Sequence, residues 1–317
     1  MSNPPPPHNR RGFRLTIICA LPLEAENVQS VFDICWEDED IQCGKAEGDQ
    51  NAYSTGMVAR HNVVLAHMPS MGNNSASAVA AGLRSSFPEV KLVVIVGICG
   101  VVPFHATTQQ EIILGDVIIS TAVVQYDFVR QYPENFQRKR HIEKIWEELP
   151  LRFAHLSKEV PSAKYPGTSR DHLYEASYLH RHQTDAGLTC DMCNDNLVPC
   201  PKTCADLECG QDMIIRRDRL NLQEVLGPEG IPDHVPIIHF GRFGSANMVM
   251  KSGVDRDRIA KVDELIAFEM ESAGVWDQYP TLVIKAACDS ADSHKSKNWQ
   301  DYAAVAAAAC LKAFLKE

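Results

Sequence analysis

Residues 92–101 read Leu-Val-Val-Ile-Val-Gly-Ile-Cys-Gly-Val, and this stretch decides the fold class. Its first half, residues 92–96, is a continuous apolar and β-branched run, which is typical of a strand buried on both faces of a parallel sheet. Gly97 and Gly100 then permit a close approach of the backbone to a ligand, although strand-to-helix punctuation explains such glycines equally well. Further runs of this kind predict strands at residues 15–18, 62–66, 116–120, 237–240 and 281–284.

Helical patterns separate these runs, so the sequence predicts an α/β fold with a sheet covered on both faces and ligands at the carboxyl ends of the strands. Residues 150–232 break the alternation with prolines, clustered cysteines and a charged run, which we interpret as an insertion. Residues 1–12, with four consecutive prolines, are predicted to be a disordered tail before one domain at 13–317. The predicted helices lie at residues 76–84, 143–148, 256–266 and 302–315.

Composition narrows the classes of partner. The chain has 317 residues, 45% of them hydrophobic, and a formal net charge of -10. The negative charge argues against a nucleic-acid surface, which relies on clustered Lys and Arg, and favours a small-molecule partner. Residues 1–12 lack the apolar centre of a secretory signal, and no apolar run approaches the roughly 20 residues that span a bilayer. We therefore expect a soluble, cytoplasmic protein that binds neither nucleic acid nor membrane.

Three carboxylates lie where an α/β sheet presents catalytic groups. Glu24 follows the first predicted strand and is suited to act as a base on water, or else to be an ordinary acid in a first helical turn. Glu271 lies in an apolar stretch, where it could accept two hydroxyls of a sugar diol or face solvent from an amphipathic helix. Asp289 follows the last strand and could protonate a purine near N7 as the glycosidic bond breaks.

A turn-rich loop at residues 69–76 surrounds Gly72 and opens a helix. The free N–H groups of that helix could hold an anion or a hydroxyl, although the loop lacks the Gly-Lys-Ser/Thr of a P-loop. Together with the turn at Gly97, Ile98 and Cys99, it is the predicted water or anion loop.

These motifs, in this order, resemble the purine nucleoside phosphorylase and methylthioadenosine nucleosidase superfamily from about Leu15 to Leu315, apart from the insertion. The resemblance is carried by the Gly-Asp-hydrophobic strand at residues 115–120, the base-binding turn at 244–247, the ribose pair Met270-Glu271 and the catalytic acid in Cys288-Asp289. Residues 289–295, 298–300 and 302–304 resemble its fungal branch, whose domains commonly stand N-terminal to NACHT and repeat modules. The chain is then expected to be a stand-alone member or an excised effector domain.

The resemblance implies a single-domain, three-layer αβα fold with a twisted, mixed and largely parallel sheet. It also implies catalysis without a cofactor and a homo-oligomer, either a dimer or a trimer, with active sites near subunit contacts. It assigns roles by position: Glu271 would hold the ribose hydroxyls with Met270 under the sugar, Asp289 would contact the purine, and Val249, Met250 and Asn247 would bind the base.

The nucleophile separates the two branches of the superfamily. Phosphorylases hold phosphate with an Arg and a Ser, and the corresponding positions here are Ile95 and Ile98, which cannot compensate a phosphate dianion. Nucleosidases activate water with a Glu that aligns with Glu24, and Lys285 stands where they have an Arg that helps to hold this water. The sequence therefore favours a hydrolase. The first alternative is a phosphate-dependent purine nucleoside phosphorylase, and the second alternative is a catalytically silent nucleotide-sensing module.

The fungal branch resembles effector domains that hydrolyse ATP to adenine and ribose 5'-triphosphate, so we place an adenine nucleotide ahead of a plain purine nucleoside. A triphosphate requires basic residues near the ribose 5' position. Surface solvation explains such residues equally well. The candidates are Arg130, Arg138, Lys139, Arg140 and Arg242.

Five of the eleven cysteines gather in the insertion, at Cys190, Cys193, Cys200, Cys204 and Cys209. The spacing of the first four would suit a tetrahedral structural zinc site away from the hydrolytic centre. Free thiols in a flexible insertion are the other interpretation.

Overall fold

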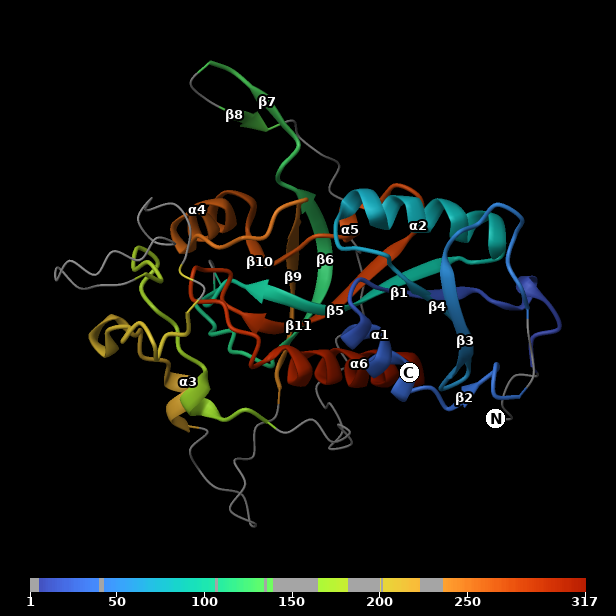
Figure 1. Cartoon of the computed structure of the whole chain (residues 1–317), viewed down its shortest axis with the longest axis horizontal. Helices are drawn as coiled ribbons and strands as arrows, with labels where there is room; N and C mark the ends of the chain where they lie inside the picture. The colour runs from blue at the N-terminus through green and yellow to red at the C-terminus, as the bar shows by residue number, and fades with distance from the viewer. Residues whose placement is uncertain are drawn as a thin grey trace, which may run out of the picture.

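The structure is a computed structural model that describes residues 6–39, 43–105, 108–133, 136–138, 165–181, 200, 202–222 and 236–317 (Figure 1). The predicted helix at 143–148 lies outside the described residues, as do Cys190, Cys193, Lys139 and Arg140. In the part of the chain that is described, no helix has the length and apolar character needed to cross a membrane.

The predicted strand 92–96 is part of β5 (Leu92–Val101), which lies between β1 (Leu15–Cys19) and β11 (Thr281–Asp289) and pairs with both in parallel. The described strands of the central sheet follow the order β10-β9-β6-β11-β5-β1-β4-β3-β2. The remaining strands are β2 (Ile34–Cys35), β3 (Ala52–Val58), β4 (His61–His67), β6 (Val117–Gln125), β9 (Ile238–Ser245) and β10 (Leu265–Glu269).

The sheet mixes parallel and antiparallel pairs. Strands β1 and β4, β6 and β9, and β9 and β10 pair in parallel, whereas β6 with β11 and β3 with β4 are antiparallel. Strand β10 also pairs with the end of β5, through Ala267 with Val101 and Phe268 with Gly100. This second pairing brings the end of β10 beside the ends of β5 and β11, where the candidate site lies.

Helices cover both faces of the sheet (Figure 1). The helices α2 (Asn73–Ser86) and α5 (Ser272–Trp276) contact each other on one face, and α1 (Pro22–Ser30) contacts α6 (Gln300–Lys316) on the other. The prediction of a three-layer αβα fold with a mixed sheet is confirmed. Smaller described elements are the hairpin of β7 (Val129–Gln131) and β8 (Phe136–Arg138), the helices α3 (Asp218–Leu222) and α4 (Gly253–Asp263), and 3-10 turns at Arg10–Gly12, Thr168–Arg170 and Gln211–Met213.

Two local predictions were wrong. The helix expected over 256–266 ends at Asp263, Glu264 takes a left-handed conformation with φ 54°, and β10 follows directly. The apolar side chains at residues 265–268 satisfied the helical period, but both faces of this strand are buried, which removes the polar alternation expected of a strand. The predicted tail was also too long, because Pro7 is buried and Arg11 pairs with Glu89 at 3.3 Å.

The described parts of the insertion lie beyond the carboxyl ends of β5 and β11 (Figure 1). Arg219 of α3 forms an ion pair with the fully buried Asp116, with 3.0 Å between Nη2 and Oδ1. Burial raises the pKa of Asp116, but the hydrogen bonds and charges of His239 and Arg219 outweigh it and hold the pKa at about 2. The indole of Trp299 in turn donates to the carbonyl of Arg170. The described parts of residues 150–232 are therefore anchored to the core by buried polar contacts.

Candidate active site

A cavity of about 320 Å³ opens where β1, β5, β10 and β11 end. It gathers residues that are far apart in sequence, because parallel strands present their carboxyl ends at one edge of a sheet. Gly72, Gly97 and Asn247 do not line it. The predicted residues that line it are Glu24, Ile98, Cys99, Val249, Met250, Met270, Glu271, Lys285 and Asp289.

Glu24 lies in the first turn of α1 and is only 2% exposed. Its Oε2 accepts the N–H groups of Ala20 and Leu21, both at 2.9 Å, and its Oε1 accepts that of Ile98 at 2.8 Å. A Cβ on Gly97 would lie 2.0 Å from Glu24 Oε1, so only glycine permits this approach. Burial raises the pKa of Glu24, while the charge of Lys285 acts in the opposite direction.

Glu271 and Lys285 form a buried ion pair, with 2.7 Å between Glu271 Oε2 and Lys285 Nζ. Burial alone would raise the pKa of Glu271, but the charge and hydrogen bond of Lys285 lower it overall. The pKa of Lys285 is raised, because the carboxylates of Glu271, Glu269 and Glu24 outweigh its own desolvation. Lys285 was expected beside the water of Glu24, whereas its shortest contact is with the predicted ribose carboxylate.

Glu269 lies at the same buried end of the cavity, but its carboxylate accepts hydrogen bonds from the backbone. Its carboxylate accepts the N–H of Glu271 at 2.9 Å and both the N–H and the hydroxyl of Ser272, which begins α5. Burial raises the pKa of Glu269. Of the two acids that flank Met270, Glu269 therefore fixes the start of a helix. In Glu271, the oxygen Oε1 accepts only one long hydrogen bond from the described residues, from the N–H of Gly72 at 3.4 Å, and remains available to a ligand.

Asp289 ends β11 on the open side of the cavity. Its Oδ1 accepts the N–H of Ala291 at 2.8 Å and lies 2.9 Å from Lys295 Nζ. Its Oδ2 has a weak contact with the thiol of Cys288 at 3.4 Å, which leaves that oxygen available to a ligand. Lys295 was missed as a site residue, although it stands in the same 289–295 stretch that carries the family resemblance.

Asn247 was predicted to bind the base, but its side chain supports the backbone instead. Its Oδ1 accepts the N–H of Asn73 at 2.9 Å, and so satisfies a free donor at the start of α2. Gly72, with φ 113°, lies against the same oxygen, since a Cβ there would be 3.0 Å from it. Of the 69–76 loop, Met71 lines the cavity, whereas Gly72 contacts Glu271 from outside it, with 3.4 Å from the Gly72 nitrogen to Glu271 Oε1.

The mouth of the cavity is apolar and basic. Met71, Met248 and Val249 line it and are each 49% exposed. Arg130 and Arg242, two of the predicted phosphate ligands, do not line it, and Arg242 lies 3.5 Å from Glu264. Arg130 belongs to β7 of the small hairpin, and Arg242 lies within β9 rather than at its end. The cations among the described lining residues are Lys251, Lys285, Lys295 and Lys297.

The fold is of the α/β class, with carboxylates gathered where its central strands end. The chain belongs to the phosphorylase superfamily, whose sequence profile matches residues 14–190. In fold it is similar to a 5'-methylthioadenosine/S-adenosylhomocysteine nucleosidase from Neisseria meningitidis, with a TM-score of 0.53, 15% identity, and coverage of 96% of this chain and 98% of that one. Futalosine hydrolase of Helicobacter pylori gives a TM-score of 0.52 at 14% identity, covering 96% and 97% of the two chains.

A relative in sequence comes from a fungus. A nucleotide-binding leucine-rich repeat (NLR)-like protein of Hyaloscypha variabilis is 26% identical over 310 residues, which covers 94% of this chain and 28% of the relative. The chain thus spans less than a third of the length of that relative. This similarity accords with the resemblance to a fungal branch.

Proposed function

We propose that this chain hydrolyses the N-glycosidic bond of a purine, with an adenine nucleotide or nucleoside as substrate. The observation that carries the proposal is the pair of carboxylates in one cavity whose pKa values are shifted in opposite directions, Glu24 upward and Glu271 downward. Such a separation gives neighbouring acids different roles. The acid with the raised pKa suits proton transfer, and the one paired with Lys285 stays ionised as a hydrogen-bond acceptor.

In the proposed reaction, Glu271 Oε1 accepts the ribose hydroxyls while Oε2 remains bound to Lys285. Water attacks the anomeric carbon, and Glu24 accepts the proton that the water loses. The bond from the anomeric carbon to the purine breaks, and its electron pair passes into the base. Asp289 enters the reaction protonated on Oδ2 and donates that proton to N7, so the turnover leaves Asp289 ionised and Glu24 protonated. The products are a free base and a ribose with a new hydroxyl.

Phosphorolysis fits these residues less well. The side chain of Ile95 is 1% exposed and belongs to the hydrophobic core, and the N–H of Ile98 already donates to Glu24. Lys285, the cation at the buried end, is held by Glu271. A phosphate dianion at this position would meet carboxylates and apolar side chains, and its desolvation would be uncompensated.

A phosphorylated substrate is favoured by the basic mouth. Lys251 and Lys297 are exposed, Lys295 is half-buried, and all three line the cavity. Ammonium groups hold phosphates as point charges, so these lysines replace the predicted arginines as candidates for the 5'-phosphates of ATP or another adenine nucleotide.

We also propose a homo-oligomer, a dimer or a trimer, in which a second copy covers part of the mouth. The exposed side chains of Met71, Met248 and Val249 lie together there, and apolar side chains that gather on a surface mark contact sites. Light scattering on the purified chain tests this assembly, and a monomer at micromolar concentration would contradict it.

The function is tested by chromatography of ATP, ADP, AMP, adenosine and guanosine after incubation with and without phosphate. We expect free base to appear without phosphate, and Asp289→Ala to lose most of the activity. Asp277→Ala, which changes an exposed aspartate that does not line the cavity, serves as the control. Strictly phosphate-dependent release would favour the phosphorylase, and no release by the purified oligomer would favour a silent nucleotide-sensing module.

A further inference from the structure

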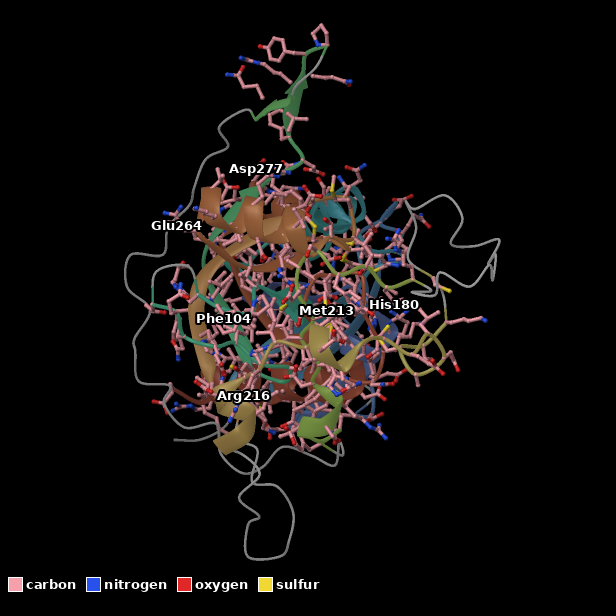
Figure 2. The ribbon with its side chains drawn as sticks, turned by 90° about the vertical axis from the view of Figure 1, so that its left-hand side faces the viewer. Phe104, His180, Met213, Arg216, Glu264 and Asp277 are labelled. Carbon is pink, nitrogen blue, oxygen red and sulfur yellow. The ribbon has the colours of Figure 1, made fainter. Side chains whose placement is uncertain are left out.

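A second cluster of reactive side chains lies beside the candidate active site. It joins His180, Cys204 and Cys209 of the insertion to His294 of the loop that follows β11. Figure 2 shows His180 on the face of the molecule where Met213 of the insertion also lies. One ligand atom from each of His180, Cys209 and His294 falls within 4.8 Å of the others. The hydrolytic chemistry uses none of these four side chains.

The two thiols converge on one imidazole nitrogen. Cys204 and Cys209 stand at the two ends of a turn closed by a hydrogen bond of 3.0 Å from the N–H of Cys209 to the carbonyl of Cys204. Their sulfurs lie 3.5 Å and 3.7 Å from His180 Nδ1. A tetrahedral zinc with ordinary bonds to sulfur and nitrogen separates those atoms by about 3.6 Å. The spacing of Cys204 and Cys209, with four residues between them, is also one that zinc sites use.

The tautomer of His180 is fixed by its other nitrogen. Nε2 lies 2.7 Å from the backbone carbonyl of Lys202, which can only accept a hydrogen bond. The proton therefore resides on Nε2, and Nδ1 presents its lone pair to the two sulfurs. A backbone carbonyl that holds the distal N–H of a histidine is the usual outer shell of an imidazole that binds a metal.

His294 supplies a nitrogen without a partner. Its Nε2 is buried and makes no hydrogen bond within the described part of the chain. The ring is held in place by stacking on Tyr174, with 4.1 Å between ring centroids, and its edge faces His180 at a centroid distance of 5.1 Å. A buried imidazole nitrogen with no partner costs free energy that a bound cation would recover.

We propose that His180, Cys204, Cys209 and His294 bind one tetrahedral Zn²⁺. A ligand set of two sulfurs and two imidazole nitrogens favours zinc, which they bind tetrahedrally, over the hard cations that prefer oxygen. Binding converts the two thiols to thiolates and releases their two protons to solvent. This ligand set keeps Cys204 from the earlier expectation but leaves out Cys200. The sulfurs of Cys204 and Cys209 contact His180 Nδ1, and no such contact of the Cys200 sulfur is found among the described residues.

The metal would fasten the insertion to the loop that carries Asp289. The N–H of His180 donates to Ser293 Oγ at 3.1 Å, next to His294. A second cavity, of about 420 Å³, is lined by Cys204 and His294 and also by Asp289 and Lys295. Zinc at this point would therefore hold the segment from Asp289 to Lys295 in place while taking no part in bond cleavage.

The first experiment measures metal content and affinity of the full chain. Protein purified in reducing buffer without chelator is analysed by mass spectrometry for zinc, then stripped and titrated with Zn²⁺ against a chromophoric chelator. We expect about one zinc per chain and, after exchange, a cobalt spectrum of a tetrahedral site with thiolate ligands. A stripped, folded chain that takes up no Zn²⁺ would overturn the proposal, as would a cobalt spectrum without thiolate bands.

The second experiment assigns the ligands. Cys209→Ser and His294→Ala should each lower zinc affinity at least tenfold, whereas His294→Cys, which keeps a ligand, should retain the metal. Cys35→Ser is the control, because Cys35 lies in β2 outside the cluster. The double variant Cys190→Ser, Cys193→Ser should also retain zinc. Loss of zinc from that variant, or full retention in His294→Ala, would exclude the proposed set, whatever the outcome of the assays for base release.

Discussion

The two ends of the candidate cavity are built in opposite ways. At the buried end, Glu24 and Glu271 are almost inaccessible and are fixed by backbone N–H groups and by Lys285. At the open end, Val249 is half exposed, and Lys295 reaches Asp289 from a flexible stem. The residues at the buried end are positioned by helices and strands of the core, and those at the open end are positioned by loops. The difference teaches that the residues proposed to break the bond are positioned by the sheet, whereas those proposed to choose the substrate lie on loops, which vary and move more readily.

The largest expected effect comes from removing the base at the buried end. Glu24→Gln keeps the shape of the side chain but cannot accept a proton, so we expect kcat to fall by about 10²- to 10⁴-fold with KM little changed. Steady-state kinetics with adenosine and ATP measure this change. Glu26→Gln, an exposed residue on the same helix, is the control and should behave as wild type. An equally active Glu24→Gln would remove Glu24 from the mechanism.

Lys285 is expected to support the buried end as a whole. Lys285→Met leaves Glu271 and Glu269 without their cation, and an uncompensated buried charge costs about 3–5 kcal/mol of unfolding free energy. Urea unfolding measures the loss. Lys312→Met, which breaks a surface pair with Asp33, should cost less than about 1 kcal/mol. If Lys285→Met were as stable as Lys312→Met, the buried carboxylates would not depend on Lys285.

The pH dependence should follow the raised pKa of Glu24. A base must be deprotonated to accept a proton, so activity is lost as pH falls through the pKa of this group in the folded state. Because burial raises that pKa, the acid limb of kcat/KM should lie above the range of an ordinary glutamate, about 4.3. A profile of residual activity in Glu24→Gln should lack this limb. An acid limb that persists there would belong to another group.

The smallest effect is expected at the open end. Replacing Lys251 and Lys297 together by Ala should lower kcat/KM for ATP about tenfold relative to adenosine, since exposed charges contribute about 0.2–1 kcal/mol each. Unfolding free energy should not change, because both side chains are exposed. The ratio of the two substrates, measured in one assay, isolates the contribution of phosphate. An unchanged ratio would mean that other residues contact the phosphates or that the substrate is a plain nucleoside.

Much of the fold could be predicted because buried strands carry their own signal. The runs at 15–18, 92–96 and 281–284 are the three central strands of the sheet. Strand β3 was not predicted, and the start of β10 was predicted as the end of a helix. The residue pattern of one segment does not show which other segments will pack against it or pair with it. Pairing between β10 and both β9 and β5 is a property of the assembled sheet.

The sequence by itself determined the class of fold and which acids follow which strands, because periodicity and strand ends are local properties. Only the tertiary structure decided what each polar side chain does there. It placed Lys285 against Glu271, made Asn247 the acceptor for an N–H at the start of α2, and brought His294 beside His180 and Cys209. The physical reason is that a buried polar group takes whichever partner the folded chain places within hydrogen-bond reach, and that partner is distant in sequence.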